Sequence, residues 1–131
     1  SNEGALSEKE EKKRILQKLK EEFFADWTQW DTAKLVFTLS VPFGIGQYLL
    51  SRWLSRKIRK KIGDDAFFKI GSAVTAIVVS AFVKIPIPPD LVEKAIRWDQ
   101  GEKVVFSQSE QAYIQNATMT ALDTAIATAV K

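Results

Sequence analysis

Six cationic side chains fall within ten residues in the middle of the chain, and no acidic residue follows them before Asp64. On a helix these cations spread over more than one face, and Trp53, Leu54, Ile58 and Ile62 form an apolar strip between them. A short, basic, amphipathic segment of this kind favours the anionic headgroups of a membrane surface. The predicted membrane-surface or partner-binding residues are Arg52, Trp53, Arg56, Lys57, Arg59, Lys60 and Lys61.

Two other interpretations of the basic segment stay open. The first is a solvated connector whose charge keeps the protein soluble. The second is a nucleic-acid surface, which is disfavoured because no stacking aromatic other than Trp53 lies among the cations. The net charge of +3 hides this local concentration, since residues 32–89 carry +7 while residues 1–31 and 90–131 each carry −2.

Catalytic and metal-binding chemistry finds little support in the sequence. The chain contains no histidine and no cysteine, which removes the commonest general base, the commonest transition-metal ligand and every thiolate site. Asp64 and Asp65 are adjacent, a placement more natural at a helix N-terminus than in a pair that divides acid and base roles. We therefore expect a protein that is not an enzyme, with no metal and no cofactor.

The basic segment joins two apolar runs, so residues 33–89 are predicted to form a hydrophobic helical hairpin. Its first arm is Ala33–Leu50 and its second arm is Ala66–Pro89. Pro42 and the glycines after it break helices. In a soluble fold they would divide the first arm into helices at about Asp31–Ser40 and Ile45–Lys61. The residues predicted to insert into a bilayer are Leu35, Val36, Phe37, Phe43, Ile45, Ile70, Ile77, Val78, Val79, Phe82 and Val83.

The rest of the chain predicts amphipathic helices that cover this hairpin. Apolar residues recur every three or four positions in these segments, which indicates one buried face on each helix. The expected helices span about residues 8–30, 90–100 and 107–130. Their predicted capping boxes are Ser7–Glu10, Asp90–Glu93 and Ser107–Glu110. We expect a single all-α domain, residues 1–131, built as a small bundle of about five helices around the hairpin.

Whether the hairpin lies in lipid or in a protein core decides the predicted function. Trp27 and Trp30 precede the first arm and Trp53 follows it, so one continuous helix would hold these interfacial aromatics about 34 Å apart, close to the bilayer thickness. The cations between the arms also match the positive-inside bias. Against this, the uninterrupted apolar segments are shorter than the roughly 20 residues of a spanning helix.

A helical bundle that covers an insertable hairpin resembles, in its design, the pore-forming domains of bacterial toxins. The resemblance rests on the pattern of residues 33–89 and on no family motif. It implies a protein that is soluble at first, binds anionic lipid through the basic segment and then inserts the hairpin to permeabilise the membrane. The alternative is a soluble all-α interaction module, such as an adaptor or immunity-type protein, whose basic surface binds an acidic partner. A constitutive two-span membrane protein is the third possibility.

Overall fold

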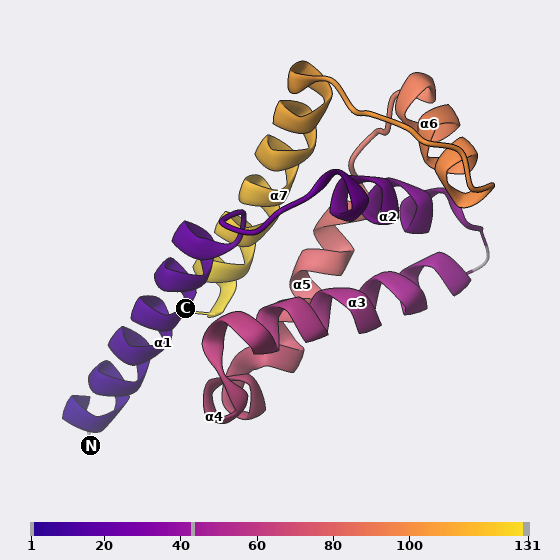
Figure 1. Cartoon of the computed structure of the whole chain (residues 1–131). Coiled ribbons are helices and arrows are strands. Elements are labelled where there is room, and N and C mark those ends of the chain that lie inside the picture. The colour runs from indigo at the N-terminus through magenta and orange to yellow at the C-terminus, as the bar shows by residue number, and fades with distance from the viewer. Residues whose placement is uncertain (1, 43, 130–131) are drawn as a thin grey trace.

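The computed structural model describes residues 2–42 and 44–129, and within these ranges it contains helices and connecting segments but no β-strand. The predicted all-α helical bundle is thus confirmed (Figure 1). The chain runs through α1 (Asn2–Glu22), α2 (Gln29–Ser40), α3 (Ile45–Ile62), the single turn α4 (Asp64–Ala66), the π-helical segment η1 (Phe67–Gly71), α5 (Ser72–Phe82), α6 (Pro89–Asp99) and α7 (Gln108–Ala129).

The first apolar run is two helices that fold back on each other. α2 ends at Ser40 and α3 begins at Ile45, as the helix breakers predict for a soluble fold. Gly44 adopts a left-handed conformation (φ +81°) at the start of α3, which glycine tolerates best. Gly46 has room for no side chain, because a Cβ there would lie 2.0 Å from the backbone oxygen of Thr38. The backbones of α2 and α3 therefore approach closely at Gly46, where the two helices pack against each other.

The basic segment is part of a helix of the bundle, as the soluble-fold division of the first arm predicts. It forms the C-terminal half of α3, and most of its apolar strip is buried. Trp53, Leu54 and Ile58 are at most 6% exposed. The apolar core therefore uses the same helix that carries the cations, and the helices α2, α3 and α5 form the centre of the fold.

The core lies where α3 and α5 meet α1 and α7. α5 contributes Val74, Val78 and Phe82, and α7 runs alongside it for much of its length (Figure 1). The exposed side of α5 carries small residues, among them Ala73, Ala76 and Ser80. Of the residues predicted to insert, Leu35, Val36, Ile70, Val78 and Phe82 are buried, Phe37, Ile77 and Val79 are partly buried, Ile45 and Val83 are exposed, and Phe43 lies outside the described residues.

The N-terminal helix is shorter than the predicted span 8–30. α1 ends at Glu22, and a new helix starts after Thr28. The Thr28 hydroxyl accepts a hydrogen bond from the Asp31 amide (3.2 Å), while the Asp31 carboxylate accepts one from the Thr28 amide (2.8 Å). This capping box satisfies the first free amides of α2, so the apolar stripe continues across a helix boundary.

The three predicted capping boxes had different outcomes. The Ser107–Glu110 box is confirmed, because each residue's side chain accepts a hydrogen bond from the other's backbone amide. The Ser7–Glu10 box is wrong, since α1 already begins at Asn2. The Asp90–Glu93 box is also wrong, since α6 begins at Pro89 with Pro88 as its cap and no capping side chain.

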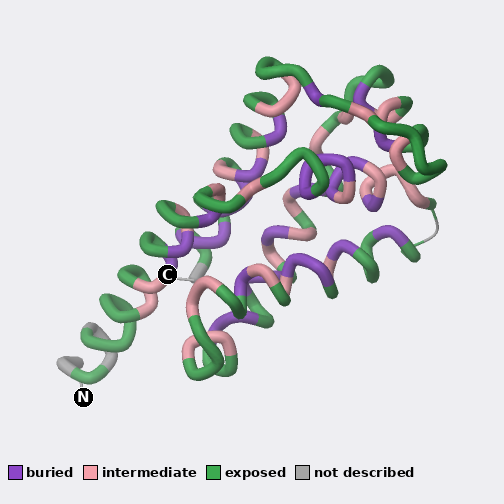
Figure 2. The backbone as a smooth tube through the Cα atoms, in the orientation of Figure 1, coloured by how far each residue is buried: buried purple, intermediate pink, exposed green. Residues whose placement is uncertain are grey.

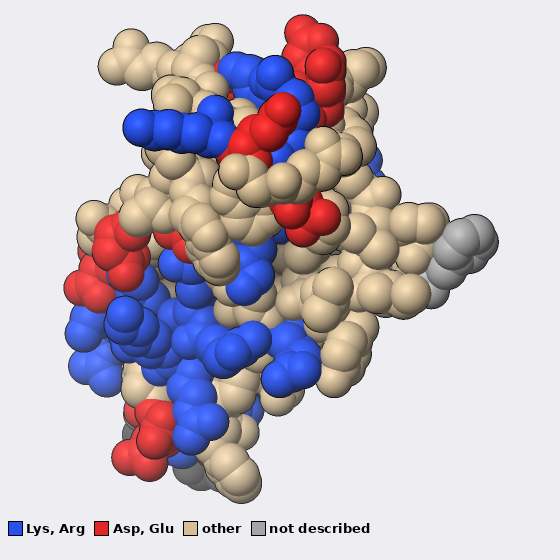
Figure 3. Space-filling view, turned by 45° about the vertical axis from the view of Figure 1, so that its right-hand side comes forward, with Lys and Arg blue, Asp and Glu red and all other residues tan. Residues whose placement is uncertain are grey.

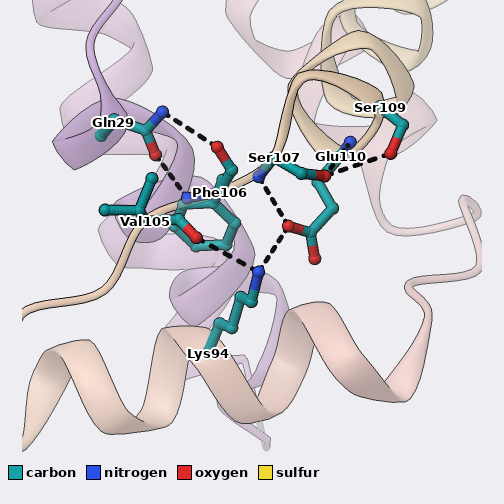
Figure 4. Close-up of polar contacts among 7 residues, drawn as sticks. All are labelled: Gln29, Lys94, Val105, Phe106, Ser107, Ser109 and Glu110. Atoms are coloured by element: carbon teal, nitrogen blue, oxygen red, sulfur yellow. Dashed lines mark hydrogen bonds and ion pairs between the residues drawn. The ribbon is translucent and has the colours of Figure 1, made fainter.

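A set of polar contacts ties the α6–α7 connection to α2 (Figure 4). The Gln29 amide group accepts from the Phe106 amide at 2.6 Å and donates to its carbonyl at 3.1 Å. Lys94 of α6 forms an ion pair of 2.6 Å with Glu110 of α7 and donates to the carbonyl of Val105. These contacts hold α6 beside α2, which positions one wall of the candidate site.

Replacing Glu110 by glutamine is expected to lower the free energy of unfolding by about 1 kcal/mol at pH 7. Burial raises the pKa of Glu110, but the hydrogen bonds from Lys94 and Ser107 outweigh it and bring the pKa below its usual value. A carboxyl whose pKa is lower folded than unfolded stabilises above its unfolded pKa, and this stabilisation is lost as the pH falls through the folded pKa. Chemical denaturation of both proteins should therefore show a difference that disappears in acid; a difference independent of pH would contradict the assignment.

Candidate anion-binding surface

One side of α3 is exposed along its whole length and carries no acidic residue. Buried and exposed residues alternate along this helix (Figure 2). At 100° per residue all exposed side chains of α3 except that of Gln47 fall within one sector about 120° wide. We call this sector the α3 outer face, and its members are Ile45, Tyr48, Leu49, Arg52, Arg56, Arg59 and Lys60. Its first half is apolar and its second half is cationic.

The cations of α3 divide into those with a carboxylate partner and those without. Lys57 pairs with Asp31 at 3.0 Å, Arg59 with Asp64 at 2.7 Å and Lys61 with Asp26 at 2.7 Å. Among the residues that the structure describes, Arg52, Arg56 and Lys60 have no carboxylate within 4.0 Å. Figure 3 shows a broad patch of Lys and Arg side chains with acidic groups at its margins, and a smaller basic group near the top of the view. Three uncompensated charges thus remain on the α3 outer face.

The inner edge of this patch is a packed cluster of tryptophan, lysine and aspartate. Asp31 is 6% exposed, and its charge is met by Lys57. The Lys57 ammonium lies over the rings of both Trp27 and Trp53, 5.4 and 5.5 Å from their centroids. A desolvated cation gains from such ring faces as well as from its carboxylate. Lys57 therefore has a structural role here, which its place in the predicted binding set did not indicate.

The tryptophans expected at opposite ends of a span meet in this fold. The rings of Trp27 and Trp53 are 5.7 Å apart because α2 and α3 fold back on each other. Trp30 is 50% exposed and packs instead against Trp98 of α6, with ring centroids 5.5 Å apart. The separation of about 34 Å expected for one continuous helix is therefore absent from the folded bundle. The interfacial role of the three tryptophan rings stays a prediction for a membrane-bound state.

A groove lies between α2, α3 and α6, beside the α3 outer face. Its volume is about 290 Å³, and it is lined by Trp30, Lys34, Phe37, Thr38, Leu49, Arg52, Trp53, Arg56, Trp98 and Asp99. A second hollow of about 260 Å³ shares Lys34, Trp53 and Arg56 with it and continues toward Lys60 and Lys61. We call the first hollow the cationic groove. Lys34 and Trp98 are not among the binding residues predicted from the sequence.

Lys34 sits in this groove among like charges. Its ammonium lies 4.6 Å from the centroid of the Trp30 ring. Burial lowers its pKa below the ordinary lysine value, and the nearby charges of Arg56 and Lys57 lower it further, while Asp31 acts in the opposite direction. Such surroundings oppose the charged ammonium, so an anion that entered the groove would favour it.

One helix in the described part of the chain is long and apolar enough to cross a membrane. It is the continuous stretch Asp64–Phe82, 19 residues long, with a mean hydropathy of 1.5 and 33% of its most apolar window buried. Core helices of soluble proteins also have this length and composition. Near the start of this stretch, Phe68 is 93% exposed and is followed by Lys69. Its aromatic ring therefore projects into solvent between the C-terminus of α3 and the N-terminus of α5.

Comparison of the chain with protein families, with curated proteins and with solved structures finds no match. Function is therefore inferred from the geometry above. The two features that carry chemistry are the acid-free α3 outer face and the cationic groove next to it.

Proposed function

We propose that this protein is a membrane-active helical domain that docks on anionic bilayers and then permeabilises them. The observation that carries the proposal is the α3 outer face, on which exposed apolar residues continue directly into three cations without carboxylate partners. Amphipathic helices of this composition lie in the plane of the membrane interface. The proposal therefore places the domain on the lipid surface before any segment inserts.

In the docked state α3 lies parallel to the bilayer. From Ile45 to Lys60 the outer face extends about 22 Å, enough to contact several headgroups at once. Tyr48 is 60% and Ile45 59% exposed, so both side chains enter the interface without any rearrangement of the bundle. The free cations contribute about 1 kcal/mol each near an anionic surface. Docking is thus an electrostatic step with apolar anchorage.

Permeabilisation is the second step of the proposal. The stretch Asp64–Phe82 is about 28 Å long as a helix, close to the roughly 30 Å hydrocarbon core. Its insertion requires that the buried faces of Val78 and Phe82 leave the core they share with α7. Lys69 lies near one end, where a lysine can reach the headgroups. The α2–α3 pair would follow or stay at the surface.

The experiment is co-sedimentation with vesicles together with release of a trapped dye. Vesicles containing phosphatidylglycerol should bind the protein and release dye. Binding should weaken strongly between 50 and 500 mM salt because salt screens surface charges; the Debye length falls to about 3 Å at 1 M. Phosphatidylcholine vesicles are the matched control and should bind weakly. Binding without dye release would overturn the second step alone. No binding to anionic vesicles would overturn the proposal and favour an acidic protein partner for the same face.

A further inference from the structure

The cationic groove brings together side chains from three helices that are distant in sequence. Lys34 comes from α2, Arg52 and Arg56 from α3, and Trp98 from α6. α6 is held in place by the contacts of Lys94 and Gln29 described above, so the groove does not depend on one helix alone. Its volume of about 290 Å³ is at the small end of ligand sites and fits a headgroup rather than a large cofactor.

The groove has more positive charge than the surrounding carboxylates neutralise. Lys34, Arg52 and Arg56 have no ion-pair partner among the described residues. Asp31, whose charge acts on Lys34, is already bound, with one carboxylate oxygen on Lys57 and the other on Thr28. Asp99 lines the groove but forms no ion pair with these cations. The cluster thus has positive charge available to an anion from outside the chain.

Part of the groove lining is aromatic. Trp98 packs edge-on against both Trp30 and Phe37, with centroids 5.5 and 6.4 Å apart. Trp30 remains half exposed, so its ring can contact a bound molecule. The groove thus combines cations with flat aromatic rings, and the Lys34 ammonium itself lies against the Trp30 ring. This combination suits an anion attached to a short apolar group.

We propose that the cationic groove binds the phosphate of an anionic phospholipid, with Lys34 and Arg56 as its ligands and Trp30 and Trp98 against the glycerol. The guanidinium of Arg56 can bind phosphate oxygens with two parallel hydrogen bonds, and the Lys34 ammonium adds a point charge. The inference rests on the proposed membrane docking and deepens it, since it assigns one headgroup to a defined site at the edge of the α3 outer face.

The test uses monomeric lipid, so that binding in the groove is measured without a membrane. Tryptophan fluorescence of the full chain is titrated with dihexanoyl phosphatidic acid below its micelle concentration. Saturable binding is expected, at least tenfold tighter than that of inorganic phosphate, with no binding of dihexanoyl phosphatidylcholine. Lys34→Gln and Arg56→Gln should each weaken binding about tenfold, whereas the matched control Lys13→Gln, on the exposed side of α1, should leave it unchanged. Thermal unfolding followed by circular dichroism checks that each variant is folded.

The possible results distinguish lipid binding in the cationic groove from binding to the α3 outer face. Absence of saturable binding, or a folded Lys34→Gln variant with parental affinity, overturns the groove whatever the vesicles show. Equal affinity for inorganic phosphate and the short-chain lipid overturns the lipid assignment. The double variant Ile45→Ser/Tyr48→Ser changes the α3 outer face without touching the groove lining. It should lose vesicle binding and keep binding of the monomeric lipid; loss of both overturns the separation of the two sites.

Discussion

Replacing Arg52, Arg56 and Lys60 together by glutamine is expected to weaken binding to anionic vesicles by about two orders of magnitude. These cations lack carboxylate partners among the described residues, so their charge is available to lipid. At about 1 kcal/mol per cation near the surface, three substitutions remove about 3 kcal/mol, and each 1.4 kcal/mol is a factor of ten. All three side chains are exposed, so the fold should be unaffected.

The matched control is the triple variant Lys9→Gln, Lys13→Gln and Lys18→Gln. It removes the same number of charges from exposed positions of α1, away from the α3 outer face. Co-sedimentation at several lipid concentrations gives both affinities. The control should lose no more than a few-fold. Equal losses in the two triple variants would mean that net charge alone drives binding, which contradicts a role for the α3 outer face.

Replacing Gly46 by alanine is expected to lower the free energy of unfolding by about 3 kcal/mol or more. The added Cβ would lie 2.0 Å from the Thr38 backbone oxygen and 2.7 Å from that of Val41. Backbone oxygens cannot move aside as a flexible side chain can, so the α2–α3 turn must open. Urea denaturation followed by circular dichroism measures the loss.

Gly44→Ala is the control for this effect, because Gly44 lies only two residues before Gly46, at the start of α3. A Cβ at Gly44 meets nothing within 4 Å, but the residue has a φ of +81°. Alanine pays only for the left-handed conformation there, about 1–2 kcal/mol. If Gly46→Ala cost no more than Gly44→Ala, the close approach of α2 and α3 would not be a feature of the folded protein.

The local structure of much of the chain is predictable from its sequence. Pro42 with the glycines after it predicts the break between Ser40 and Ile45, because both residue types disfavour a continuous helix. Ser107 and Glu110 likewise predict the cap of α7, since that box satisfies backbone groups only a few residues away. Signals of this kind act over one helical turn, but they do not always decide where a helix begins. The boxes predicted at Ser7–Glu10 and Asp90–Glu93 are wrong because α1 and α6 begin upstream of them.

One local signal was present and masked by a stronger pattern. Thr28 and Asp31 have the spacing of a capping box, yet the apolar stripe from Leu16 to Trp30 predicts one unbroken helix. The apolar side chains still face the core up to Phe23, and the turn at residues 23–26 then changes the direction of the chain. Periodicity thus predicted the burial of Leu16, Leu19 and Phe23, but it predicted neither the end of the helix nor the half-exposed position of Trp30.

The candidate site depends on contacts that no local pattern specifies. Lys34, Arg56 and Trp98 belong to three helices, and only the fold-back of α2 on α3 and the docking of α6 bring them together. The same fold-back places Trp27 on Trp53, where a single span would have held them far apart. The sequence identified the cations as a group; it could not show which of them have partners and which are free.

The central claim is that the protein docks on anionic membranes through the α3 outer face. A measurement of how α3 is oriented on the membrane tests it most directly. The chain has no cysteine, so one introduced thiol can carry an environment-sensitive NBD fluorophore at a chosen site. Tyr48→Cys places it on the α3 outer face, and Thr120→Cys places it at an exposed position of α7. With phosphatidylglycerol vesicles, we predict a blue shift and a several-fold rise in emission at position 48 and little change at position 120. Equal responses, or a response confined to position 120, would contradict docking through α3.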